Sequence, residues 1–282
     1  MQYKVLKSVS GIYTVRNENN ETLEIPASGK LRYLEQSPIV GDNVIVENGV
    51  IVNILPRENF FIRPKVANID QMIVFMSIEK PKFQSFLVDK YFAIIESKNI
   101  EPVLFITKSD LNPEEANQIA SLYRGMKYHV ELIDNVSGYN HNHLIDIFTG
   151  KYSVFMGQSG VGKTTTINAL GNHSFSTQEI SKALGRGKHT TRVVSIIDFN
   201  GGYLIDTPGF SSLTLDLSKE QLSKSFKIFR ELSKSCKFRN CLHYNENIDN
   251  CAIKQNIGTK LIPQIRYNNY IKLLDELSKG ER

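Results

Sequence analysis

The stretch "VFMGQSGVGKTTTINAL", residues 154–170, decides the fold of the chain. It holds the pattern G-x-x-x-x-G-K-T from Gly157 to Thr164, which is the signature of a phosphate-binding loop. An apolar strand, "YSVFM", precedes the loop and a helical run, "KTTTINAL", follows it, as the signature requires. The glycines let backbone N–H groups face phosphate oxygens, and the helix N-terminus favours negative charge. We therefore predict a nucleotide-binding α/β domain built around this stretch.

Individual residues of the loop have predicted roles. Lys163 is expected to reach the β- and γ-phosphates, and the Thr164 hydroxyl is expected to ligate Mg²⁺. The predicted nucleotide contacts in this stretch are Gly157, Gln158, Ser159, Gly160, Val161, Gly162, Lys163, Thr164 and Thr165.

Upstream, "FITKSD" ends a predicted buried strand with Thr107, Lys108, Ser109 and Asp110. This is a variant of the N-K-x-D guanine signature, in which the aspartate accepts from guanine N1–H and the 2-amino group. Adenine offers neither donor. Thr107 replaces the usual asparagine, which removes an amide hydrogen bond but leaves the discriminating carboxylate. The alternative is a helix cap before "LNPEEA"; next to a phosphate loop, the guanine interpretation is favoured.

A third motif, "LIDTPGF" at residues 204–210, follows another strand. Asp206 is expected to bind Mg²⁺ through water, and the Gly209 N–H is expected to meet the γ-phosphate. A Pro-Gly turn without a ligand is the alternative.

Two weaker signals complete the nucleotide site. In the glycine-rich "LGRGKHTTR", Thr190 is predicted to close over Mg²⁺ as a switch residue, with Thr191 as the second choice. His189 is either a catalytic or RNA-contacting group or an ordinary exposed histidine. In "DNVSGYN", Val136 and Ser137 are predicted to support the base through their main chain.

The order of these motifs differs from that of an ordinary GTPase, where the phosphate loop comes first. Here the guanine motif precedes the phosphate loop, and the predicted switches follow it. The order indicates a circular permutation, which preserves geometry if the original termini lay close together. The "DTPG" motif then leads directly into the C-terminal segment, so nucleotide state would be able to move that segment.

The segments on either side divide the chain into three predicted domains, 1–66, 67–215 and 216–282. Residues 1–56 read as five short strands, with a type I′ hairpin at Asn48-Gly49. Such a module is a small barrel, either an OB-fold that contacts nucleic acid or an SH3-like barrel, and a packing role is also open. Residues 57–66 read as a linker. Alternating strands and helices then predict a parallel sheet covered on both faces.

The C-terminal segment reads as helical. A helix over "KEQLSKSFKIFRELSKS" places Leu222, Phe226, Phe229 and Leu232 on one stripe that packs on its own domain. A last helix, "PQIRYNNYIKLLDELSKG", follows. Residues 216–282 carry 13 Lys/Arg and 8 Asp/Glu, and this excess of five positive charges equals the net charge of the whole chain. This excess fits an RNA partner or simply a basic surface.

Composition sets further bounds. No apolar run resembles a signal peptide or reaches the length of a membrane span, so a cytoplasmic protein without a membrane partner is expected. All three cysteines, Cys236, Cys241 and Cys251, lie within 16 residues, and an odd count argues against a disulfide framework. Without an interaction signature, a monomer is expected.

A barrel, then T-K-S-D, G-Q-S-G-V-G-K-T, G-R-G-K-H-T-T and D-T-P-G-F, then a Cys/His cluster, resembles the RsgA family of small-subunit-dependent GTPases. The resemblance covers essentially the whole chain. It implies an OB-fold, a permuted GTPase domain and a C-terminal zinc domain. It also implies that the small ribosomal subunit and its rRNA stimulate GTP hydrolysis during late subunit maturation.

The family's zinc pattern is Cys-x₄-Cys-x-His-x₅-Cys. Cys236, Cys241 and His243 match it, but seven residues instead of five precede Cys251. Three thiolates and one imidazole suit a structural, tetrahedral Zn²⁺, and a slightly longer loop can still close. Three inert buried thiols are the alternative.

Phe210 bears on the mechanism, because many GTPases place there a glutamine that orients the attacking water. Slow intrinsic hydrolysis by the protein alone is therefore expected, with help from His189 or from the ribosome.

The motifs together leave three candidate functions. They are a triggered GTPase, a guanine-nucleotide-gated RNA-binding scaffold with incidental hydrolysis, and an ATP-using enzyme, which Asp110 disfavours.

Overall fold

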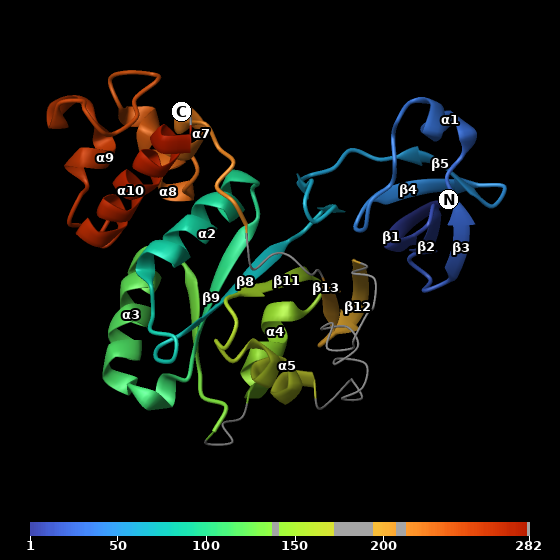
Figure 1. The fold of residues 1–282 in the computed structure, drawn as a ribbon, viewed down its shortest axis with the longest axis horizontal. Coiled ribbons are helices and arrows are strands. Elements are labelled where there is room, and N and C mark those ends of the chain that lie inside the picture. The colour runs from blue at the N-terminus through green and yellow to red at the C-terminus, as the bar shows by residue number, and fades with distance from the viewer. Residues whose placement is uncertain (137–140, 172–193, 207–212, 281–282) are drawn as a thin grey trace. The chain divides into compact units, whose positions relative to one another are not determined.

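The computed structural model describes residues 1–136, 141–171, 194–206 and 213–280 (Figure 1). The predicted site residues Ser137, His189, Thr190, Thr191 and Gly209 lie outside these ranges. The chain forms two compact units. The first comprises Met1–Gln71, Asn140–Phe155 and Thr164–Ser211, and the second comprises Met72–Tyr139, Met156–Lys163 and Ser212–Arg282. The predicted division into three domains stays a prediction.

The first unit begins with five antiparallel strands, as the alternating pattern predicts. They are β1 (Gln2–Val9), β2 (Ile12–Arg16), β3 (Thr22–Pro26), β4 (Asn43–Glu47) and β5 (Val50–Ile54), with α1 (Gly29–Tyr33) after β3. β1 pairs with both β2 and β4, and a bridge from Ala27 to Ile51 links the end of β3 to β5. Asn48 and Gly49 have φ of 48° and 74°, so the predicted hairpin turn is confirmed.

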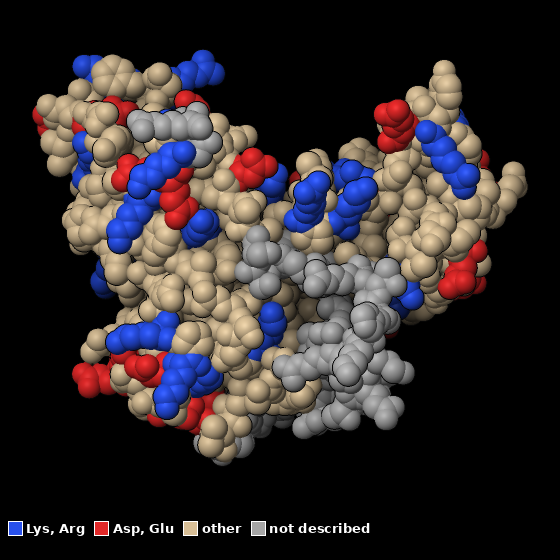
Figure 2. Space-filling view, viewed as in Figure 1, with Lys and Arg blue, Asp and Glu red and all other residues tan. Residues whose placement is uncertain are grey.

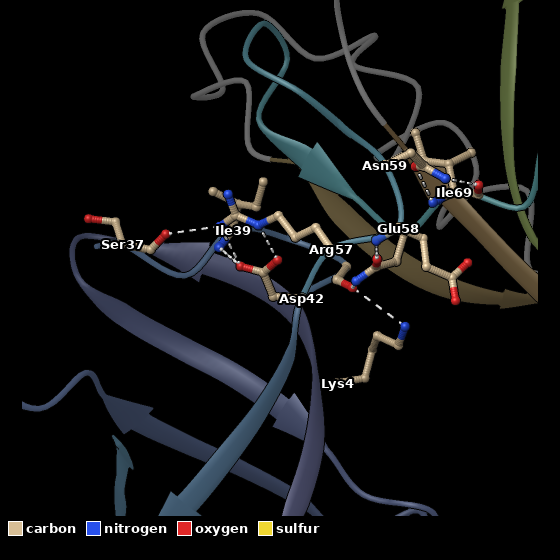
Figure 3. Close-up of polar contacts among 10 residues, drawn as sticks. Lys4, Ser37, Ile39, Asp42, Arg57, Glu58, Asn59 and Ile69 are labelled. Atoms are coloured by element: carbon tan, nitrogen blue, oxygen red, sulfur yellow. Dashed lines mark hydrogen bonds and ion pairs between the residues drawn. The ribbon is translucent and has the colours of Figure 1, made fainter. Parts of the chain in front are cut away.

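The segment after the barrel is tied to it by a buried ion pair (Figure 3). The Asp42 side chain is fully buried, and Arg57 donates to it from Nε at 2.7 Å and from Nη2 at 2.8 Å. Asn59 and Ile69 exchange two hydrogen bonds of 2.9 Å across the same segment. Two short strands also pair here, β6 (Phe60–Phe61) and β7 (Val66–Ala67). The predicted linker is thus an ordered connection.

Three further strands of the first unit surround an aromatic core. They are β11 (Tyr152–Gly157), β12 (Ser195–Phe199) and β13 (Gly202–Asp206), with η2 (His141–Leu144), α4 (Ile145–Phe148) and α5 (Lys163–Gly171). β11 runs parallel to β13, and β12 runs antiparallel to β13. Phe148, Phe155 and Phe199 pack edge to face beneath them. β1 of the barrel joins β12 through one pair, Lys7 and Ser195.

The second unit contains the parallel strands that the apolar runs predict. β8 (Gln71–Ser77) is buried along its whole length and lies beside β9 (Glu101–Thr107), which runs parallel to β10 (His129–Ile133). The helices are α2 (Ser85–Ser97) and α3 (Pro113–Gly125), and η1 (Ser109–Leu111) follows β9. Continuous burial of β8 is the signature of a sheet covered on both faces.

The predicted single helix over 219–235 is wrong, because the chain breaks it into α7 (Lys219–Ser223) and α8 (Lys227–Leu232). Phe226 is extended at the break. The Arg230 guanidinium donates to the carbonyls of Lys224 and Ser225 at 3.1 and 2.5 Å. The Glu96 carboxylate of α2 accepts from the Lys227 N–H at 3.2 Å. Side chains therefore satisfy the backbone groups that a continuous helix would have paired.

The chain ends with η4 (Ser233–Ser235), η5 (Ile248–Asn250), α9 (Ala252–Gln255) and α10 (Gln264–Gly280). α10 packs against α2 through Arg266, which is 3.2 Å from Asp89, with side chains only 1% and 2% exposed. Asn269 donates to the same carboxylate at 2.7 Å, and Tyr123 donates to it at 3.0 Å. This buried network joins the C-terminal helices to the α/β part of the second unit.

Candidate functional site

The phosphate loop lies between β11 and α5, as predicted, and two of its glycines have backbone conformations that other residues rarely adopt. Gly157 has a φ of 152°, and a Cβ there would lie 2.6 Å from the Phe75 carbonyl oxygen of β8. Gly162 has a φ of 85°, and a Cβ there would meet the Thr107 side chain at 3.6 Å. Larger residues would strain the backbone at both positions. The loop thus follows the surface formed by the ends of β8 and β9.

The guanine motif is bonded directly to the phosphate loop. The Thr107 hydroxyl donates to the Val161 carbonyl. Lys108 has left-handed backbone, with a φ of 54°, and its ammonium donates to the Gly160 carbonyl at 2.8 Å and also to the Lys80 carbonyl. The threonine therefore provides a hydrogen bond of its own to the loop in place of the asparagine amide. The segments predicted to bind the base and the phosphates are therefore bonded to each other.

The remaining residues near this motif differ in exposure. Ser109 is buried, whereas Asp110 is exposed in the turn η1, where its carboxylate is accessible to a ligand. Val136 is 83% exposed, and its N–H donates to the Asp134 carboxylate at 2.8 Å. That N–H is therefore already bonded, which leaves the Val136 carbonyl for any contact with a base.

The residues predicted to contact phosphate and Mg²⁺ lie at the start of α5 and at the end of β13. The Lys163 ammonium lies 3.5 Å from the Gly157 carbonyl of its own loop. Thr164 and Thr165 follow in the first turn of α5, half-buried and exposed respectively. Asp206 is the last residue of β13, paired in the ladder with Ser195. Thr164 and Asp206 belong to the first unit, and the guanine motif belongs to the second.

Three residues that the motifs did not indicate also shape the loop. Phe75 closes against Gly157, Lys80 offers its carbonyl to Lys108, and the Asn135 amide lies 3.9 Å from a Cβ built on Gly162. Phe75 sits in an apolar run, and the other two sit in loops, so no local pattern marks them. Only the fold brings them to the site.

A second site gathers the three cysteines around one histidine. The Nδ1 atom of His243 lies 3.7 Å from the Cys236 sulfur, 3.2 Å from the Cys241 sulfur and 3.4 Å from the Cys251 sulfur. All four potential ligand atoms lie within 4.8 Å of one another. A tetrahedral Zn²⁺ with ordinary bond lengths separates its sulfur and nitrogen ligands by about 3.5 Å. The donor set and its spacing can hold a metal ion.

The loop between His243 and Cys251, longer than the family pattern, is held by its own glutamate. Glu246 accepts from the Leu242 N–H at 2.7 Å and from the Tyr244 N–H at 2.8 Å. These bonds flank His243, which has a left-handed backbone conformation with a φ of 56°. The extra residues therefore do not prevent His243 and Cys251 from meeting.

Two tyrosines of α10 hold the same loop from the other side. Tyr267 donates to the His243 carbonyl at 2.8 Å, and Tyr270 donates to the Leu242 carbonyl at 2.5 Å. Burial raises the pKa of the Cys241 and Cys251 thiols. A bound cation would favour the thiolates and oppose that effect.

On the face in Figure 2, basic side chains over the C-terminal helices lie among acidic ones. Within the described residues, no helix combines the length and apolar character that a membrane crossing demands.

Comparison with known families gives two adjoining matches. The model of the RsgA N-terminal domain matches residues 3–50, and the model of the RsgA GTPase matches residues 54–216. The second match alone spans more than half of the chain. It contains the guanine motif, the phosphate loop and Asp206.

Relatives and solved structures agree with these matches over nearly the full length. The small ribosomal subunit biogenesis GTPase RsgA of Mycoplasmopsis agalactiae is 49% identical and covers 100% of both chains. The structure of YjeQ from Thermotoga maritima has 30% identity, 98% coverage of both chains and a TM-score of 0.82. That of YloQ, described as a circularly permuted GTPase, has 32% identity, 99% and 95% coverage and a TM-score of 0.80. The predicted fold, with barrel, permuted GTPase and C-terminal Cys/His cluster, is confirmed.

Proposed function

The chain belongs to the RsgA GTPase family, and from this premise we propose that the small ribosomal subunit stimulates its hydrolysis of GTP to GDP and phosphate. It binds the subunit in the GTP state during late maturation and leaves after hydrolysis. The observation that carries the proposal is the bonding of the guanine motif to the phosphate loop, through Thr107 and Lys108. That arrangement suits one nucleotide held at its base and its phosphates together.

Each predicted residue then has a role in the proposal. Asp110 selects guanine, and the N–H groups of residues 157–162 and the Lys163 ammonium hold the phosphates. Thr164 and Asp206 would hold Mg²⁺, which neutralises charge on the β- and γ-phosphates when bound. With Phe210 in place of a water-orienting glutamine, hydrolysis by the free protein is slow. His189 or a group of the subunit completes the site.

The remaining parts provide the attachment to the subunit. The barrel and the C-terminal helices contact rRNA, and Zn²⁺ on Cys236, Cys241, His243 and Cys251 stabilises the C-terminal fold. The protein acts as a monomer in the cytoplasm, where small subunits mature. Zinc is favoured over other metals because the site offers three thiols and one imidazole in a closed, largely buried cluster.

The first experiment measures GTP hydrolysis by the purified protein alone, with small subunits and with large subunits. We expect strong stimulation by small subunits only. GTP-dependent binding to the subunit without stimulation would instead favour the guanine-nucleotide-gated scaffold. Equal displacement of bound GDP by ATP and by GTP would refute the guanine assignment.

An Asp110→Asn variant sharpens the assignment of the base. An amide in place of the carboxylate cannot accept from guanine N1–H and the 2-amino group together, because its NH2 group is a donor, but that group can donate to the 2-oxo group of xanthine. We expect GTP affinity to fall by about a hundredfold, since a charged hydrogen-bonding group contributes roughly 1.5–3 kcal/mol. XTP should bind the variant better than the wild type. An unchanged preference for GTP would remove Asp110 from the site.

A further inference from the structure

Within the first unit, four side chains form a row that joins the barrel to strands β11 and β13. Tyr152 of β11 and Tyr203 of β13 stack with ring centres 4.5 Å apart and planes 13° apart. The Lys4 ammonium, from β1, lies 4.3 Å from the centre of the Tyr152 ring. The Arg16 guanidinium, from β2, lies 5.2 Å from the centre of the Tyr203 ring. Each end of the aromatic pair thus carries a cation from the barrel.

Arg16 makes a second contact, with strand β12. Its Nη1 and Nη2 atoms donate to the two carboxylate oxygens of Asp198 at 3.1 and 2.9 Å. Asp198 and Tyr203 are partners in the β12–β13 ladder. One guanidinium therefore binds both strands of the hairpin, with the planar, two-pronged geometry that arginine offers to a carboxylate.

The hairpin that Arg16 binds leads directly to a predicted site residue. β13 ends three residues after Tyr203 at Asp206, the predicted Mg²⁺ contact, and the "DTPG" motif continues from there. The Arg16 side chain is 16% exposed, and that of Asp198 is 70% exposed. Water therefore reaches the ion pair, so it can break and re-form at little cost in free energy.

We propose that Arg16 is a positioning residue for the subunit-stimulated reaction only, because it couples the barrel to the β12–β13 hairpin and hence to Asp206. A subunit bound at the barrel biases the hairpin through this contact, and nucleotide state biases the barrel in return, because coupling between two sites is reciprocal. This inference rests on the proposed function for the identity of the subunit as the ligand, but the contact itself does not.

The first test compares Arg16→Lys, Arg16→Met and Asp198→Asn in hydrolysis assays at saturating small subunits. We expect the rate without subunits and the GDP affinity to stay unchanged, while the stimulated rate falls about 5- to 150-fold, the usual range of such coupling. Arg16→Lys should behave like Arg16→Met, since a lysine keeps the charge but cannot form the two-pronged contact. Arg32→Met, on the barrel but outside the row, is the control for loss of one positive charge.

The charge exchange Arg16→Asp with Asp198→Arg provides the rescue. It should recover part of the stimulation that either single reversal loses. An unchanged stimulated rate in Arg16→Met would overturn the proposal, as would equal losses in Arg16→Met and Arg32→Met.

A second test needs no ribosome and separates this inference from the proposed function. Amide hydrogen exchange of Ile12–Arg16 is compared between GDP and a non-hydrolysable GTP analogue. We expect the nucleotide to alter exchange in β2 of the wild type and not of Arg16→Met, while β13 responds in both. If subunits do not stimulate hydrolysis by the wild type, the proposed function fails. The exchange measurement then decides by itself whether Arg16 couples the barrel to the hairpin. A β2 response that persists in Arg16→Met refutes the coupling.

Discussion

Arg16 in the barrel and Arg266 in α10 each form an ion pair with a carboxylate of the nucleotide-binding fold, and the two pairs differ in their exposure to water. In the first unit, Arg16 and Asp198 are 16% and 70% exposed. In the second unit, Arg266 and Asp89 are 1% and 2% exposed. Exposed pairs contribute roughly 0–1 kcal/mol, whereas loss of one partner from a buried pair costs about 3–5 kcal/mol. The ion pair between Arg16 and Asp198 can therefore break and re-form, whereas the pair between Arg266 and Asp89 is expected to stay formed in the folded protein.

The buried junction is also continuous with the candidate metal site, Cys236, Cys241, His243 and Cys251. Arg266 and Asn269 of α10 bind Asp89 of α2, while Tyr267 and Tyr270 donate to the carbonyls of His243 and Leu242. These four residues lie within two turns of one helix. Disturbance of the metal should therefore spread to α2, but the barrel strands should not respond.

Removal of the metal is the most severe way to test this difference. We expect a chelator to unfold the segment 236–262 and to loosen α10, because Zn²⁺ contributes on the order of 10 kcal/mol in small structural sites. Amide hydrogen exchange should rise in α2 and α10 and stay unchanged in β1–β5. Cys251→Ser serves as the metal-deficient variant. An equal rise of amide exchange in β1–β5 would show that the barrel and the C-terminal helices do not unfold independently.

Arg266→Met tests the buried pair itself. We expect the free energy of unfolding to fall by about 3–5 kcal/mol, because Asp89 would be left charged and buried. Urea titration measures the change. The double variant with Asp89→Asn should be more stable than Arg266→Met alone, since the stranded charge is gone. A double variant that loses the sum of both single effects would contradict this account.

Glu96 should make the buried junction sensitive to pH. Burial raises the pKa of its carboxyl, while Arg266, the Lys227 N–H, Tyr128 and Arg230 oppose that rise. Between the unfolded and folded pKa values the native protein binds more protons, so this group's contribution to stability falls as pH rises through the folded pKa. Urea titrations at pH 5 and pH 8 should show a smaller decline for Glu96→Gln than for the wild type. An identical decline would exclude Glu96 as its source.

Arg16→Met should have the smallest effect on stability. Because Asp198 is largely exposed, we expect a change of less than about 1 kcal/mol in the free energy of unfolding. The same urea titration as for Arg266→Met provides the direct comparison. A loss as large as that of Arg266→Met would mean that the barrel contact is structural, and it would weaken the case for a reversible coupling.

The sequence predicts features that depend on local pattern. The apolar run "EPVLFIT" gives β9 with the predicted bounds, and Asn48-Gly49 gives the predicted turn. The phosphate loop is equally local, because its glycines and its flanking strand and helix are contiguous. The cysteine cluster was predictable because a metal site needs few residue types at close spacing.

Features that depend on distant partners were not predictable from pattern. Arg266 and Tyr270 of α10 are buried because Asp89 and the Leu242 carbonyl lie against them, and no local pattern in the predicted last helix marks these partners. The break between α7 and α8 has the same cause, since Glu96 is more than a hundred residues away in the chain. The N-K-x-D motif predicts a lost hydrogen bond where threonine replaces asparagine. The Thr107 hydroxyl nevertheless donates to the Val161 carbonyl of the phosphate loop.

The meeting of β1 with β12 has a consequence for solubility. A strand at the edge of a sheet offers unpaired N–H and C=O groups to any other chain, which is a common start of aggregation. Here Lys7 of β1 pairs with Ser195 at one end of β12, and the charged Asp198 lies further along the strand. A fragment that begins after the barrel would uncover this edge. We therefore expect such a fragment to self-associate more readily than the whole chain.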